Sequence, residues 1–282
     1  MHYFALAAAV LTGTLSSCGD STPPAGDTAK TDTVAPAPRP QPALSAVSSS
    51  PEFPGAAITI GAVKAEPVGK DSAKVSFNFN VKNYDLKMQT ADNGTKQCNN
   101  SAQGQHIHFI MDAMPYKALY EPKNEITLAN GTEHYLMAFL SRSYHESVKS
   151  QGAAVVYHFR IDEKGRVQKM DDPKTPMVFY SRPKGDYLGN DTANLLLDFY
   201  VWNCNLAPDG YKVKADVYPA GGVPVEQVSF TLDKWEPRFI NNLATGKSKI
   251  TLTLIDKDGK AVEGPCTSAT REFNLAAQEP MK

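Results

Sequence analysis

Histidines are the side chains of this sequence best suited to chemistry, and several of them lie in one region. His106 and His108 alternate with apolar residues in the segment Gln105–Phe109, and His134 follows on the next expected strand. Side chains two residues apart on a β-strand project from the same face. Two neutral imidazoles on one face, with a third nearby, could bind Zn(II) or Cu(II). The sequence therefore offers His106, His108 and His134 as a candidate metal site. The alternative is three surface or structural histidines, because no Asp, Glu or Cys pattern completes a site.

Basic residues beside hydroxyl groups form a second candidate site. Arg142 lies between Ser141 and Ser143, and Arg182 and Lys184 follow Tyr180 and Ser181. A guanidinium with neighbouring hydroxyls is suited to bind a phosphate or a carboxylate. Arg142, Arg182 and Lys184 are therefore candidate anion-binding residues, and the alternative is that they are solvated loop charges or form salt bridges between domains.

Sequence motifs of common enzymes are absent. The chain has no GxSxG elbow, HExxH helix, phosphate-binding GxxxxGK loop or CxxC pair. The run Ser143–Ser147 contains Ser, His and Glu, but adjacency in sequence does not make a catalytic triad. We therefore expect a protein that is not an enzyme. A net charge of -1 gives no basic excess for binding nucleic acid.

The N-terminus is typical of an exported protein. Phe4–Leu11 is a short apolar segment, and Leu15-Ser16-Ser17-Cys18 resembles the lipobox of bacterial lipoproteins. The resemblance implies that residues 1–17 are a signal peptide and that Cys18 is acylated. We expect a protein anchored to a membrane of the cell envelope, in the periplasm or at the surface. A plain secretory signal is the alternative, since no Lys or Arg precedes the apolar segment.

Residues 18–55 are rich in Ser, Thr, Pro and Ala. Such a segment cannot bury enough apolar surface to offset the loss of chain entropy on folding. We therefore expect a disordered tether between the lipid and the folded domains.

Short alternating runs separated by turn residues begin after this tether. This pattern predicts an all-β protein of the sandwich type, without long helices. The expected strands are 75–81, 106–111, 133–140, 155–161, 195–201, 211–218, 249–255 and 271–275.

An internal repeat divides the folded region. The run from Val75 to Val81 matches the run from Leu195 to Val201 in spacing and residue type. We therefore expect two homologous immunoglobulin-like sandwich domains, residues 56–165 and 166–282. The same alignment matches Met137 to Leu252, which places His134 on the outward face with His106 and His108.

Three cysteines remain if Cys18 is lipidated, namely Cys98, Cys204 and Cys266. An odd number leaves one thiol unpaired. Since Cys204 and Cys266 both belong to the second expected domain, we predict a disulfide between them.

The segment from Gln105 to Lys149, together with Tyr180–Gly185 and Asp233–Phe239, resembles a family of Bacteroidetes-type lipoproteins. Its members are labelled hypothetical or phosphopeptide-binding, which implies recognition of phosphate. With the basic loops, the resemblance predicts a membrane-anchored protein that binds a protein or an anionic ligand. A Zn- or Cu-binding protein and a purely structural spacer are the alternatives.

Overall fold

The computed structural model describes residues 41–220 and 227–277, so the expected signal peptide and Cys18 lie outside the described residues. The regular structure in these ranges is almost entirely β-strand, with two short 3-10 turns, η1 (Asn93–Thr95) and η2 (Gly189–Thr192). Within the same ranges no helix has the length and apolar character needed to cross a membrane. The expectation of an all-β protein is confirmed.

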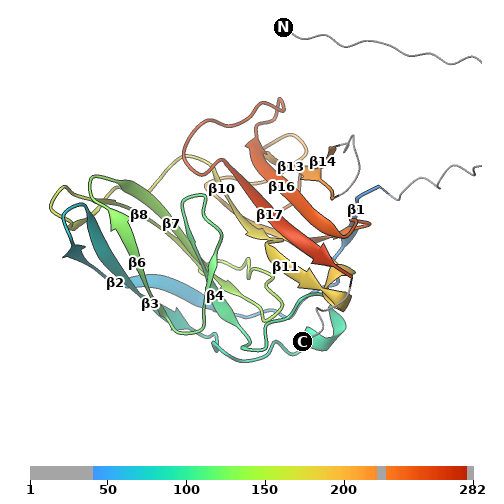
Figure 1. Ribbon diagram of the computed structural model, residues 1–282, viewed down its shortest axis with the longest axis horizontal. Helices are drawn as coiled ribbons and strands as arrows, with labels where there is room; N and C mark the ends of the chain where they lie inside the picture. Colours follow the sequence, from blue (N-terminus) through green and yellow to red (C-terminus); the bar gives the residue numbers. More distant parts are fainter. Residues whose placement is uncertain (1–40, 221–226, 278–282) are drawn as a thin grey trace, which may run out of the picture. The chain divides into compact units, whose positions relative to one another are not determined.

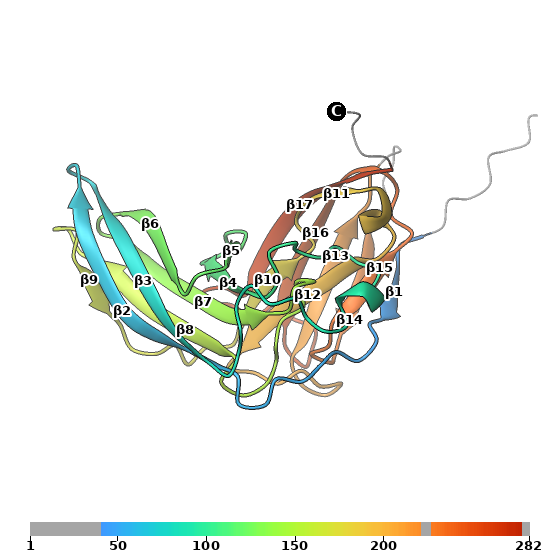
Figure 2. The same ribbon diagram turned by 90° about the horizontal axis from the view of Figure 1, so that it is seen from below.

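The first sandwich consists of a three-stranded and a five-stranded sheet. Figure 2 shows β2 and β3 side by side in the smaller sheet. The smaller sheet has the order β2 (Ala57–Val68), β3 (Ser72–Lys82), β6 (Lys123–Ala129). The larger sheet has the order β5 (Lys117–Leu119), β4 (His106–Met111), β7 (Glu133–Ser141), β8 (Ala154–Ile161), β9 (Val167–Lys169).

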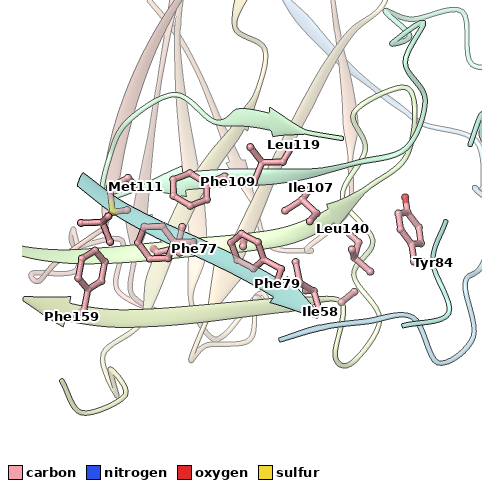
Figure 3. Packing of buried hydrophobic residues seen from close by; sticks show 14 of the residues in the cluster. Ile58, Phe77, Phe79, Tyr84, Ile107, Phe109, Met111, Leu119, Leu140 and Phe159 are labelled. Carbon is pink, nitrogen blue, oxygen red and sulfur yellow. The ribbon is translucent and has the colours of Figure 1, made fainter. Parts of the chain in front are cut away.

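Alternation in β3 builds the core between these two sheets. Phe77 and Phe79 project from one face of the strand and are buried. The ring of Phe77 meets those of Phe109 and Phe159 edge to face, with centroids 5.5 and 5.6 Å apart. Figure 3 shows these rings packed between β3, β4 and β8. Edge-to-face contact adds to the free energy gained by burying apolar surface.

The second sandwich has a four-stranded and a five-stranded sheet. Figure 1 shows β13, β16, β17 and β11 side by side. The four-stranded sheet has the order β1 (Ala43–Ala46), β15 (Arg238–Asn241), β12 (Leu195–Trp202), β10 (Met177–Arg182). The five-stranded sheet has the order β11 (Gly185–Leu188), β17 (Ser268–Ala276), β16 (Gly246–Ile255), β13 (Lys212–Tyr218), β14 (Val228–Leu232).

The two sandwiches share one strand order, as the internal repeat predicts. The order β2-β3-β6 in the first sandwich corresponds to β10-β12-β15 in the second, and β5-β4-β7-β8 corresponds to β14-β13-β16-β17. Immunoglobulin domains oppose strands A-B-E-D to strands C-F-G. The sheets of the second sandwich follow that scheme, with β1 in the place of strand D. The immunoglobulin-like fold class is confirmed.

The expected domain boundaries need correction at two places. β1 lies inside the segment 18–55 that we expected to be a disordered tether, yet it pairs with β15 of the second sandwich, where Leu44 is opposite Ile240. Leu44 packs against the second core. At the other boundary, β9 pairs with β8, so the first sandwich extends beyond residue 165. The first sandwich is therefore inserted in sequence between two strands of the second.

The register of β7 also differs from the one that the repeat alignment predicts. Leu136, Ala138 and Leu140 belong to the first core, whereas Met137 and Phe139 lie on the opposite face. A shift of one residue exchanges the two faces of a strand. His134 therefore shares the inward face with Leu136, and its ring lies 5.6 Å from that of Phe159 in the core.

A third apolar cluster covers the outward face of β4 and β7. Phe139 from the first sandwich stacks on Tyr200 from the second, with centroids 5.0 Å apart. The buried members of the cluster are Ile110, Tyr116, Met137, Phe139, Val156, Met177, Phe179 and Tyr200. The outward face of this sheet around Met137 and Phe139 is thus packed against the second sandwich and is not exposed to solvent.

A charge on β1 should destabilise the second sandwich rather than the first. Leu44 is half-buried against the second core, so the Leu44→Asp variant should lose at least about 1 kcal/mol of stability. Hydrogen exchange should accelerate in β15 and β12 but not in β3. Ala43→Asp is the matched control, because Ala43 is exposed. Equal protection of β15 in wild type and Leu44→Asp would contradict this pairing.

Candidate functional site

Three histidines converge where the two sandwiches meet. One ring nitrogen from each of His106, His108 and His145 lies within 4.8 Å of the others. The Nε2 atoms of His106 and His108 are 2.9 Å apart, and Nδ1 of His145 is 3.1 Å from Nε2 of His106. All three side chains are buried. We call His106, His108 and His145 the histidine cluster.

His106 is oriented by a backbone carbonyl. Its Nδ1 lies 2.8 Å from the carbonyl oxygen of Gly104, so Nδ1 carries the proton and Nε2 keeps its lone pair. Gly104 has φ +83°, and a Cβ there would lie 2.5 Å from the carbonyl oxygen of Lys87. Only glycine can bring this carbonyl so close to His106.

His108 is positioned by both sandwiches. Its Nδ1 lies 3.0 Å from Oγ of Ser181 on β10. Its ring stacks on that of Tyr116, with centroids 3.6 Å apart and planes inclined by 8°. These contacts direct Nε2 of His108 toward the other two imidazoles.

His145 lies in a tight turn after β7 and has φ +68°. A non-glycine residue in this region is uncommon and strained, and such residues often lie at functional sites. The backbone N–H of His145 donates to the carbonyl of Arg142, and the N–H of Arg142 donates to the carbonyl of Glu146. These two bonds close the turn and bring Nδ1 of His145 toward His106.

The side chain of Arg142 holds this turn in place. Its Nη1 lies 3.1 Å from Oε1 of Glu146 and donates to the carbonyl of Ser147 at 3.1 Å. Its Nη2 donates to the carbonyl of Pro51 at 2.6 Å. The guanidinium is buried and bonded to groups of its own chain, so Arg142 positions His145 in this structure.

The environment keeps the cluster neutral. Burial lowers the pKa of His106 to about 4, and the charges of Arg182 and Lys184 act in the same direction. Burial also lowers the pKa values of His108 and His145 well below the usual value. Neutral imidazoles with free lone pairs are the form that binds metals.

Arg182 and Lys184 lie near the histidine cluster, and their partners differ from those of Arg142. Arg182 donates to Oη of Tyr187 at 2.9 Å, and Lys184 donates to the carbonyl of Tyr116 at 2.9 Å. Among the described residues, no hydrogen bond or ion-pair partner is common to Arg142 and either of them. Burial lowers the pKa of Lys184 to about 8.

The structure separates His134 from the other two histidines of the candidate metal site. Nδ1 of His134 lies 2.8 Å from Oδ2 of Asp112, and Nε2 lies 2.7 Å from Oγ1 of Thr132. Because β7 has the other register, His134 is on the face opposite His106 and His108. His145 takes its place in the cluster. The pairing of His106 with Ser141 brings the turn containing His145 beside His106.

Cys98, Cys204 and Cys266 are free thiols. The predicted disulfide between Cys204 and Cys266 is therefore wrong. Cys204 packs against the second core, whereas Cys266 packs against the cluster between the sandwiches. A shared domain was not sufficient to place the two sulfur atoms within bonding distance.

Two of the three nitrogen–nitrogen separations in the histidine cluster are close to those of a metal site. Zn–N bonds of about 2.0–2.1 Å in tetrahedral geometry place two ligand nitrogens about 3.3 Å apart. The separations of 2.9 and 3.1 Å from Nε2 of His106 differ from this by a few tenths of an ångström, and the third pair lies within 4.8 Å. The same separations also suit hydrogen bonds between neutral imidazoles.

Comparisons with known proteins give no family. No family model matches the chain, and no curated protein matches it. The fibronectin(III)-like modules of Clostridium thermocellum CbhA align over 78% of this chain and 95% of their own, with 13% identity and a TM-score of 0.25. The chicken interferon gamma receptor alpha chain aligns over 75% and 96%, with 7% identity and a TM-score of 0.23. Similarities this low carry no argument, and the fold assignment rests on the strand order.

Loss of the Arg142 guanidinium should destabilise the protein strongly. The Arg142→Ala variant leaves the buried carboxylate of Glu146 without its cation, which costs about 3–5 kcal/mol. Urea unfolding measures this loss. The double variant Arg142→Met/Glu146→Leu should recover most of the stability, because neither charge remains buried. A single variant as stable as wild type would disprove the structural role of this ion pair.

Stability should fall on mild acidification in the presence of a chelator. Unfolded His106 binds a proton below pH 6.5, whereas folded His106 does so only near pH 4. The unfolded state therefore holds more protons in this window, and stability decreases from pH 6.5 to pH 4 by about 3 kcal/mol for this residue. Thermal melts should show a shallower decrease for His106→Gln. A slope for His106→Gln identical to that of wild type would count against the assignment.

Proposed function

We propose that this protein binds one transition-metal ion through Nε2 of His106, Nε2 of His108 and Nδ1 of His145. The observation that carries the proposal is the convergence of three neutral ring nitrogens within 4.8 Å of one another. Imidazole is a ligand of choice for Zn and Cu.

The partners of these imidazoles add support. Metal-binding histidines usually donate their second ring N–H to a carbonyl or another polar group, which fixes the ring and its tautomer. The carbonyl of Gly104 has this role for His106, and Ser181 is the polar partner of His108. The turn held by Arg142 supplies His145 in a left-handed conformation, and Oη of Tyr116 lies 3.2 Å from its Nδ1.

An anionic partner is the alternative that the basic residues indicate. Arg142 would have to leave Glu146 and two carbonyl groups before it could bind a phosphate. Arg182 and Lys184 remain close to one another around Tyr116, but both also contact their own chain. The contacts therefore favour a metal over a phosphorylated ligand.

We also propose that the protein is lipid-anchored at Cys18 in a bacterial cell envelope. The proposal rests on the lipobox-like sequence Leu15-Ser16-Ser17-Cys18. An acylated cysteine would hold the two sandwiches at a membrane without a spanning helix. Labelling with radioactive palmitate tests it, because Cys18→Ser should abolish incorporation.

Metal binding is tested by titrating the purified, chelator-treated protein with Zn(II) and with Cu(II) in a calorimeter. Wild type should bind one ion, and His106→Ala and His145→Ala should each weaken binding by at least about tenfold, as loss of a ligand requires. Elemental analysis after dialysis gives the stoichiometry independently.

His134→Ala is the matched control, since it removes an imidazole on the other face of the same sheet. It should bind as tightly as wild type. Absence of stoichiometric binding of zinc and of copper in either oxidation state by wild type would refute the proposal. Equal weakening by His134→Ala would show that the ligand set is wrong.

A further inference from the structure

The potential ligands of the histidine cluster carry no negative charge that could neutralise a bound ion. The group of potential ligands contains three histidines and no Asp, Glu or Cys among the described residues. A bound ion would therefore keep its full charge in a buried place. A neutral set of ligands therefore favours an ion of lower charge over one of higher charge.

The nearest cations raise the free energy of placing a positive ion in the histidine cluster. Nζ of Lys184 lies 4.0 Å from the ring centroid of Tyr116, and the same ring stacks 3.6 Å from that of His108. The guanidinium carbon of Arg182 lies 5.5 Å from the same centroid. Both cations repel an ion bound by the imidazoles, and the repulsion is twice as large for a divalent ion as for a monovalent one.

Loss of the ion's hydration shell also disfavours an ion of higher charge in the cluster. His106 and His108 are fully buried, and aromatic rings of Tyr116, Tyr120 and Phe139 surround them. The cost of burying a charge in an apolar medium rises with the square of the charge, so a monovalent ion costs about a quarter as much as a divalent one. Zn(II) is usually four-coordinate in proteins, so three imidazoles would hold it only with a water or another donor in the fourth position, which this buried site would have to admit.

We propose that the histidine cluster is a Cu(I) site that stabilises the reduced ion over Cu(II). This inference rests on the proposed metal-binding function and names the ion. Cu(II) bound at the site would accept one electron from an external one-electron donor such as ascorbate, which is oxidised. The site therefore shifts the copper couple toward the reduced ion and keeps it apart from solvent.

The test compares three ions on the purified full-length protein. Cu(I) affinity is measured under anaerobic conditions with ascorbate and a competing bicinchoninate chelator, and Cu(II) and Zn(II) affinities are measured with competing chelators in air. Cu(I) should bind at least tenfold more tightly than Cu(II), which corresponds to a rise of about 59 mV in reduction potential. Zn(II) should bind more weakly than both.

The outcomes separate the two proposals. If no ion binds at one per chain, the proposed function itself fails. If Zn(II) or Cu(II) binds as tightly as Cu(I), the metal site stands and the preference for Cu(I) is wrong. A ratio above ten with loss of binding in His145→Ala supports both.

Removal of one neighbouring cation tests the physical cause. The Lys184→Gln variant should reduce the preference for Cu(I) over Cu(II) by about fivefold, as expected for one charge pair at an intermediate dielectric constant. Lys249→Gln is the matched control, because Nζ of Lys249 lies 4.5 Å from the ring centroid of Tyr218 in the second sandwich. An unchanged ratio in Lys184→Gln would remove the electrostatic explanation.

Discussion

Burial of one sheet face against the neighbouring sandwich is the constraint on which the rest of this structure depends. In an isolated immunoglobulin-like domain the outward face of β4 and β7 would be hydrated. Here Phe139 stacks on Tyr200, and the part of this face that carries His106, His108, Met137 and Phe139 is buried. Water is thereby removed from His106 and His108, which lowers their pKa values and keeps both imidazoles neutral. The interface thus creates the chemistry of the site as well as the association of the two sandwiches.

Much of the fold follows from periodicity in the sequence. All eight expected strands are present, because they are among the longer strands and each contributes apolar side chains in alternation to a sandwich core. The strands that were not expected are mostly short or lie at sheet edges, where alternation is weak. β1 has four residues, and its stability comes from pairing with β15, a strand far away in sequence. No local pattern can reveal such a partner, so the composition of this segment predicts a tether.

The site was predictable only in part, for a related reason. The alternation around His106 and His108 placed both on the face opposite Ile107, which is where they lie. The repeat alignment was displaced by one residue in β7, and that shift sufficed to put His134 on the wrong face. His145 is supplied by a turn whose shape depends on Arg142, Glu146 and Pro51 together. Neither the turn nor the role of Arg142 could be read from residue types alone.

The position of β1 has a mechanical consequence. Tension applied to the chain before Ala43 reaches β15 first, although the first sandwich comes next in sequence. The hydrogen bonds between antiparallel strands run perpendicular to the strands. A pull along β1 therefore loads these bonds together in shear rather than one by one. The first sandwich bears none of this load while β1 remains in its sheet. The histidine cluster is thereby shielded from forces transmitted through the N-terminal segment until that single strand is extracted.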